Sequence, residues 1–138
     1  MQELDFEELR EKARMALYVE NLALNDLLNL NLVTNQEARE RITPMIFETY
    51  LHAAIMRGIM EAIDKTKEAL SEPAGELDQE RLKIALSAQD QAESEAVRFY
   101  SQASQELEDG FLKDLFTAIA KDEESHHKIA SNLKRFAR

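Results

Sequence analysis

Three side chains that favour metal ions fall on apolar helical faces in the last third of the chain. Glu93 interrupts a stripe of apolar residues at helical spacing between positions 82 and 107. Glu123 and His126 interrupt a second stripe between positions 112 and 133, and their spacing of three makes them neighbours on one face. Burying an ionised carboxylate without a partner is very costly, so such groups are usually paired or metal-bound. The pattern indicates a buried metal site, or a polar network satisfied by hydrogen bonds and water.

A turn at Asp109-Gly110 would bring the three residues to one level of an antiparallel helical hairpin. Glu93 lies sixteen residues before Asp109, and Glu123 and His126 lie thirteen and sixteen after Gly110. At about 1.5 Å per residue, each is roughly 20–24 Å from the turn. One Glu facing Glu-x-x-His on the next helix is half of the ligand set of a di-iron carboxylate bundle.

This constellation resembles the ferritin-like di-iron carboxylate superfamily, and within it the rubrerythrin-like branch. The resemblance lies in the second half of the chain, about residues 82–136, and is carried by ESEA at 93–96, Phe99-Tyr100, LF at 115–116, IA at 119–120 and E-x-x-H at 123–126. It implies that Glu93, Glu123 and His126 bind two iron ions. Oxygen and nitrogen ligands without sulfur also suit manganese or zinc.

The resemblance also implies a function in iron and peroxide metabolism. Such a protein would oxidise Fe(II) with O₂ or H₂O₂, for iron storage or oxidant removal, as a ferroxidase or peroxidase-type oxidoreductase. Two other functions are compatible with the sequence. One is a helical dimerisation or assembly module with a structural or relic metal site, and the other is an oxygenase acting on an organic substrate.

Further candidate ligands lie in the first half of the chain. Glu20 lies on or beside the apolar stripe of the first expected helix, and His52 lies on the stripe of the second, with Glu48 one turn before it. Glu20, Glu48 and His52 are therefore candidate metal ligands, or else ordinary positions on the flank of a helix. The spacing of Glu48 and His52 is four, not the three of the later motif.

Two further residues are candidates for supporting the metal ligands without binding the metal themselves. Tyr100 lies two turns from Glu93 and is either a hydrogen-bond donor or redox-active phenol, or a core tyrosine. His127 lies about 100° around the helix from His126, so it points outward or supports the ligands. Glu124 and His127 form a second Glu-x-x-His frame, but the apolar stripe favours the frame of Glu123 and His126.

Composition points to an all-helical chain. The 138 residues contain three Gly and two Pro, with no convincing period-2 run, and are long enough for one domain with a real core. A net charge of −10 argues against nucleic-acid binding and suits attraction of cations. The absence of cysteine excludes disulfides, thiolate zinc sites and a rubredoxin-type iron centre. No membrane span or secretory signal is recognisable, so we expect a cytoplasmic protein.

Apolar periodicity predicts four long helices, over about residues 4–32, 35–70, 78–108 and 110–137. Thr34-Asn35-Gln36-Glu37 has the form of a capping box, although Pro44 makes a start near residue 44 an alternative for the second helix. We expect one all-α domain, residues 1–138, with two antiparallel hairpins at 1–70 and 77–137. The expected fold is a ferritin-like bundle completed by a second chain.

The expectation that a second chain completes the bundle rests on the short break at residues 71–75. Running back along the second helix needs at least about a dozen extended residues. The second and third helices should therefore be antiparallel neighbours or one interrupted rod, and Glu48 and His52 then miss the level of Glu93 by roughly 7–13 Å. We expect a homodimer or higher homo-oligomer. Either two C-terminal hairpins pair about a two-fold axis with six ligands, or the hairpins are swapped and Glu20, Glu48 and His52 supply the rest.

Overall fold

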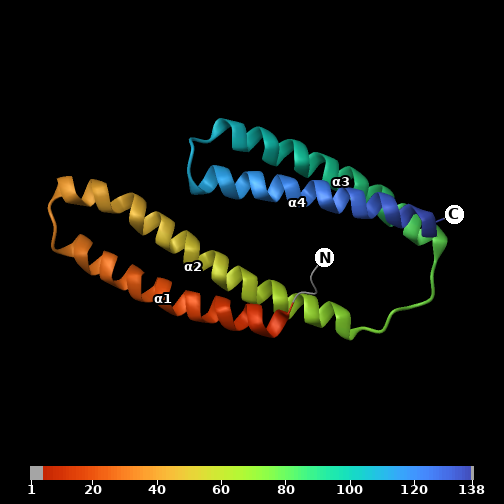
Figure 1. The fold of residues 1–138 in the computed structure, drawn as a ribbon, viewed down its shortest axis with the longest axis horizontal. Helices are drawn as coiled ribbons and strands as arrows, with labels where there is room; N and C mark the ends of the chain where they lie inside the picture. Colours follow the sequence, from red (N-terminus) through yellow and green to blue (C-terminus); the bar gives the residue numbers. More distant parts are fainter. Residues whose placement is uncertain (1–4, 138) are drawn as a thin grey trace. The chain divides into compact units, whose positions relative to one another are not determined.

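The described chain, residues 5–137 of a computed structural model, folds into four α-helices (Figure 1). They are α1 (Phe6–Leu32), α2 (Gln36–Ser71), α3 (Gln79–Glu106) and α4 (Phe111–Leu133), and a 3₁₀ turn at Lys134–Phe136 follows. No strand occurs between residues 5 and 137, so the all-α fold class is confirmed. In this part of the chain, no helix has both the length and the apolar character needed to cross a bilayer. The expected start of the first helix at residue 4 lies outside the described residues.

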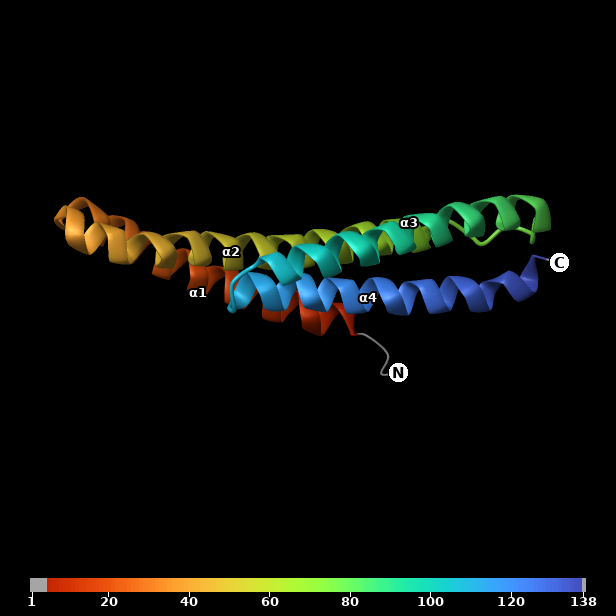
Figure 2. The same cartoon turned by 90° about the horizontal axis from the view of Figure 1, so that it is seen from above.

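The helices pack as two antiparallel hairpins (Figures 1 and 2). Helix α1 packs on α2, and α3 packs on α4. The chain divides into two compact units between Ala74 and Gly75. Each hairpin is therefore described by itself.

Local hydrogen bonds explain where three of the helices begin. Asp5, Asn35 and Asp78 each accept a bond from the backbone amide three residues on, at 2.9–3.1 Å, which satisfies a free donor of the first turn. The cap of α2 is Asn35 and not Thr34, so the helix begins one residue later than the expected capping box places it. Helix α4 begins after Gly110, whose φ of 149° is open to glycine but strained for other residues.

Helix α2 continues through Pro44, so the alternative start near residue 44 is wrong. Proline removes one backbone hydrogen bond and disfavours the preceding turn. The cap at Asn35 and the burial of Ile42 stabilise the turns before the proline. Tertiary packing of a long helix outweighs the local penalty.

The first hairpin has a narrow core of small and β-branched residues. Ala13 of α1 and Ile42, Ala53 and Ile63 of α2 are its buried apolar residues among those described. Ala53 is fully buried, at 0% exposure. A small side chain there allows the two helices to approach closely, because nothing beyond Cβ needs room.

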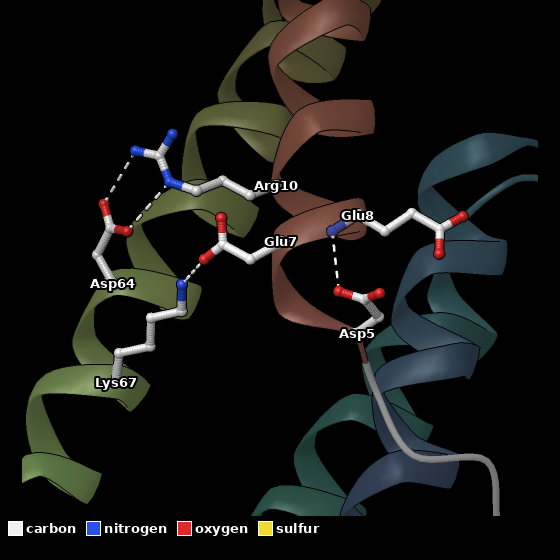
Figure 3. A network of polar contacts seen from close by, with 6 residues as sticks. All are labelled: Asp5, Glu7, Glu8, Arg10, Asp64 and Lys67. Atoms are coloured by element: carbon white, nitrogen blue, oxygen red, sulfur yellow. Dashed lines mark hydrogen bonds and ion pairs between the residues drawn. The ribbon is translucent and has the colours of Figure 1, made fainter.

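Charged contacts join the two helices near the N-terminal end of α1 (Figure 3). Arg10 donates from Nε and Nη2 to the two carboxylate oxygens of Asp64, at 3.1 and 3.2 Å, and Lys67 pairs with Glu7. The hydrogen bond from Arg10, assisted by its charge, lowers the pKa of Asp64. A lowered carboxyl pKa stabilises the fold above the unfolded pKa, and this contribution is lost as the pH falls through the folded pKa. Both side chains are exposed, so the contribution is small.

Replacing Ala53 with Leu tests the close approach of α1 and α2. Three added carbon atoms must displace packed neighbours, so we expect a loss of about 1–3 kcal/mol in unfolding free energy. Ala54→Leu is the matched control, because Ala54 is exposed on the same helix. Chemical denaturation followed by circular dichroism measures both, and equal stability of the two variants would contradict the packing described here.

Candidate metal centre

Glu93 of α3 and Glu123 and His126 of α4 converge at one point of the second hairpin. One ligand atom from each lies within 4.8 Å of the others. Nδ1 of His126 is 3.7 Å from Oε1 of Glu93 and 3.8 Å from Oε2 of Glu123. Within residues 5–137, no other group of three metal-favouring side chains gathers its ligand atoms as closely.

The packing of α3 on α4 explains this convergence. The face of α3 that meets α4 repeats every three or four residues, as expected for helices packed along a shared seam. On α3 its buried or half-buried members are Leu86, Asp90, Glu93, Val97, Tyr100 and Ser104, and on α4 they are Phe116, Ala120, Glu123, His127 and Ala130. Glu93 therefore occupies a core position and is only 4% exposed.

His126 lies beside this seam and not in it. Its side chain is 54% exposed, although it contacts both carboxylates. On the other side of the seam, Ser94 and Val97 line a groove with Glu124, His127 and Lys128. The second Glu-x-x-His frame, Glu124 and His127, thus lines this groove and does not join the cluster.

The two carboxylates are electrostatically unsatisfied without a cation. Gln89 donates a hydrogen bond to Oε1 of Glu93, whereas Oε2 of Glu93 is buried and accepts none. A hydrogen bond shared with Glu93 raises the pKa of Glu123, and desolvation and the charge of Glu93 act in the same direction. A proton on Glu123 can therefore supply the bond that Glu93 lacks. With both groups ionised, their repulsion weakens the fold as the pH rises through the pKa of Glu123.

A divalent cation fits this site, because it would replace the shared proton and pair with both carboxylates. The donor set is two carboxylates and one imidazole without sulfur. Such ligands suit iron or manganese and can hold zinc. Gln89, which sequence reasoning missed, lies one turn before Glu93 and holds its carboxylate in place.

The candidate ligands of the first half do not form such a cluster. Nδ1 of His52 lies 3.5 Å from Oε1 of Glu20, so α1 and α2 bring these two together. Glu48 is exposed on α2 and belongs to no group of three ligands in the described part of the chain. Metal binding by Glu20, Glu48 or His52 stays a prediction.

Tyr100 and His127, the two expected supporting residues, both lie between α3 and α4. Tyr100 packs edge-on against Phe99 and Phe116, at ring centroid distances of 5.3 and 5.7 Å, which makes it part of an aromatic cluster. Nδ1 of His127 lies 3.0 Å from Oδ1 of Asp90. Their roles beside a metal stay predictions.

Asp90 is the other residue that sequence reasoning missed. Its Oδ1 faces His127, and its Oδ2 lies 3.8 Å from Nζ of Lys134. Asp90 lies three residues before Glu93 and so shares its helical face. This spacing would have been enough to place it on the seam.

Comparison with known proteins agrees with this geometry. A model of the Rubrerythrin family matches residues 28–134, which is more than half of the chain. The chain belongs to the rubrerythrin family. No curated protein and no solved structure gives a significant match. The match covers all of the second hairpin and also α2 and the end of α1, so the relationship to rubrerythrins extends beyond the second half.

Glu93→Gln tests whether the two carboxylates repel each other without metal. Removing one charge should raise the melting temperature of the metal-free protein at pH 7 by roughly 2–4 °C. The same change should abolish the further stabilisation that Zn(II) or Mn(II) gives the wild type. Thermal melts with and without EDTA measure both effects. Glu124→Gln, an exposed neighbour of Glu123, is the control and should change neither.

Proposed function

We propose that this rubrerythrin-family protein holds two iron ions and oxidises Fe(II) with O₂ or H₂O₂, for iron storage or oxidant removal. One observation carries the proposal. The carboxylates of Glu93 and Glu123 and the imidazole of His126 converge, and the second oxygen of Glu93, Oε2, is buried and accepts no hydrogen bond. A site of this kind is costly to the fold unless a cation occupies it.

Each ligand has a distinct part in this proposal. Glu93 is fixed by burial and by Gln89, so it gives the site a rigid carboxylate. Glu123 and His126 share one face of α4, and His126 lies at the exposed edge of the site. When bound, iron supplies the one-electron redox chemistry. Two Fe(II) ions give up two electrons, which with two protons convert H₂O₂ into two water molecules or O₂ into H₂O₂.

We further propose that a second copy of the chain completes the site. One hairpin offers three ligands, which is half of the usual set in a di-iron carboxylate bundle. The side of the hairpin that bears His126 is apolar: Phe99, Ile129 and Leu133 are exposed large hydrophobic residues. The opposite side carries the charged residues Glu124 and Lys128, which line the groove. Two copies related by a two-fold axis would cover the apolar side and supply six ligands.

Glu123→Ala tests the oxidation. The variant removes a ligand at a half-buried position of the seam, so we expect the initial rate of Fe(II) oxidation in air or H₂O₂ to fall at least about tenfold, with circular dichroism confirming that the variant is folded. Absorbance of oxo-bridged Fe(III) follows the reaction. Glu124→Ala is the matched control and should retain the wild-type rate. Equal rates in the two variants would refute the proposed oxidation at this site.

A structural or relic metal is the alternative function, and it has a different signature. Metal would then raise the melting temperature without turnover. Thermal melts with and without EDTA, together with steady-state oxidation assays, separate the two functions. Stabilisation by metal, with no oxidation above the rate of free Fe(II), would support the assembly module instead.

Ile129→Glu tests the proposed pairing of two copies. A charge in the apolar interface should shift the protein towards the monomer and weaken iron binding, because each monomer retains only three of the six ligands. Light scattering and metal analysis measure mass and stoichiometry. Lys128→Glu, on the polar side, should leave both unchanged. A wild-type monomer that binds two irons would contradict the pairing.

A further inference from the structure

The side of α1 that faces away from α2 is apolar. Met15, Tyr18, Val19 and Leu22 are spaced three and four residues apart, so they share one face of the helix. Each is between 52% and 65% exposed. The buried and half-buried residues of α1 lie on the opposite side, and they include Ala13, Leu17, Glu20 and Leu24. The hairpin therefore leaves Met15, Tyr18, Val19 and Leu22 uncovered, and we call them the α1 stripe.

No charge interrupts the exposed side of α1 along this stripe. Charged residues make up 32% of the chain. The exposed positions between Arg14 and Asp26 are nevertheless all uncharged: Met15, Tyr18, Val19, Asn21, Leu22, Ala23 and Asn25. Glu20 is the one charged residue in this range, and it contacts His52 of α2. A helix surface that faces solvent normally carries charges, so this surface is typical of a face covered by a protein partner.

The charges at the two ends of the α1 stripe have opposite signs. Arg14 precedes the stripe, and Asp26 follows it twelve residues later. When two copies of α1 pack antiparallel about a two-fold axis at the level of Glu20, Arg14 of each copy lies at the level of Asp26 of the other. Tyr18 of each copy then lies at the level of Leu22 of the other. The stripe is thus complementary to itself in both charge and apolar character.

The neighbouring charges also favour the antiparallel direction. In this register, Glu11 of one copy lies at the level of the uncharged Asn29 of the other. A parallel pairing would instead set Arg14 against Arg14 and Glu11 against Glu11, and these like charges repel. It would also align the dipoles of two long helices, which antiparallel packing opposes.

We propose that the α1 stripe binds the α1 stripe of a second copy of this chain in antiparallel orientation. Burial of the apolar side chains drives the contact, whereas exposed ion pairs at its ends contribute little energy and set the direction and register. Arg14 pairs with Glu11 of its own helix, but its guanidinium has five N–H donors and can also bond Asp26. Four side chains on one helix bury less than the roughly 800 Å² of each partner in a standard interface, so the pairing is weak and concentration-dependent. This face does not depend on the proposed oxidation.

Cysteine crosslinking of the full chain tests the pairing, since the chain has no cysteine of its own. Met15→Cys/Asn25→Cys places two thiols about 15 Å apart on one helix, too far for a short bis-maleimide to join them within one chain. In the antiparallel pair, position 15 of one copy lies at the level of position 25 of the other. We therefore expect a covalent dimer at high protein concentration. Ile129→Glu in the background removes the pairing proposed for the second hairpin.

Each single variant is a control for this experiment. A thiol at position 15 or 25 alone lies about 15 Å along the helix from its copy in the antiparallel pair, so we expect at least about tenfold less dimer. Gly58→Cys/Glu68→Cys has the same spacing at exposed positions of α2 and measures random collision. Equal dimer yields from Met15→Cys/Asn25→Cys and from any of these controls would overturn the proposal.

Charge reversal in the crosslinking variant tests the direction of the pair. Arg14→Glu sets two acidic groups against each other at both ends of the stripe, so the dimer yield should fall at least about threefold at low salt. Adding Asp26→Arg restores opposite charges and should recover the yield. A yield that stays low in the double exchange would overturn the antiparallel register. Circular dichroism confirms that each variant is folded.

A different occupant of the α1 stripe gives a different result. Leu22→Glu should abolish the crosslinked dimer and leave the melting temperature of the diluted protein within about 2 °C of the wild type, because an exposed substitution costs the monomer little. If another part of the same chain covers the stripe, Leu22→Glu lowers that melting temperature further and no covalent dimer forms, which overturns the proposal. A failure of Fe(II) oxidation changes none of these measurements.

Discussion

Two carboxylates that face each other across a helix seam dominate the second hairpin. Glu93 occupies a position that an apolar residue would normally fill, and Glu123 approaches it from α4. Without a cation the pair is tolerated because the pKa of Glu123 is raised, which allows a shared proton. The hairpin is thus less stable than an apolar seam would make it. Such a cost is typical of functional sites, where stability is lost to chemistry.

Packing along the rest of the seam offsets this repulsion. Leu86, Ala120 and Ala130 are buried on either side of the carboxylates, and the aromatic rings of Tyr100 and Phe116 pack towards the turn. The contact of Asp90 with His127 ties α3 to α4 one turn away from the cluster. The ligands are therefore held by rigid helices, which is how a metal site keeps its geometry before the ion arrives.

The first hairpin has the same antiparallel arrangement of two helices, but less charge lies between them. Small buried residues bring α1 and α2 together, and salt bridges such as Arg10–Asp64 join them on the exposed side. Nδ1 of His52 lies 3.5 Å from Oε1 of Glu20, and Thr49 stands three residues before His52, where Glu123 stands three before His126. The cluster of three metal-favouring side chains lies in the second hairpin.

The sequence by itself determined the ligand types, their spacing and the helical class, because helical periodicity and side-chain chemistry are local properties. It placed Glu93, Glu123 and His126 at one level, since rise per residue is constant along a helix. Only the tertiary structure decided that Asp90 pairs with His127 and that α2 runs through Pro44. These depend on how each helix is rotated about its own axis. Packing against the neighbouring helix sets that rotation, and residues distant in the chain supply it.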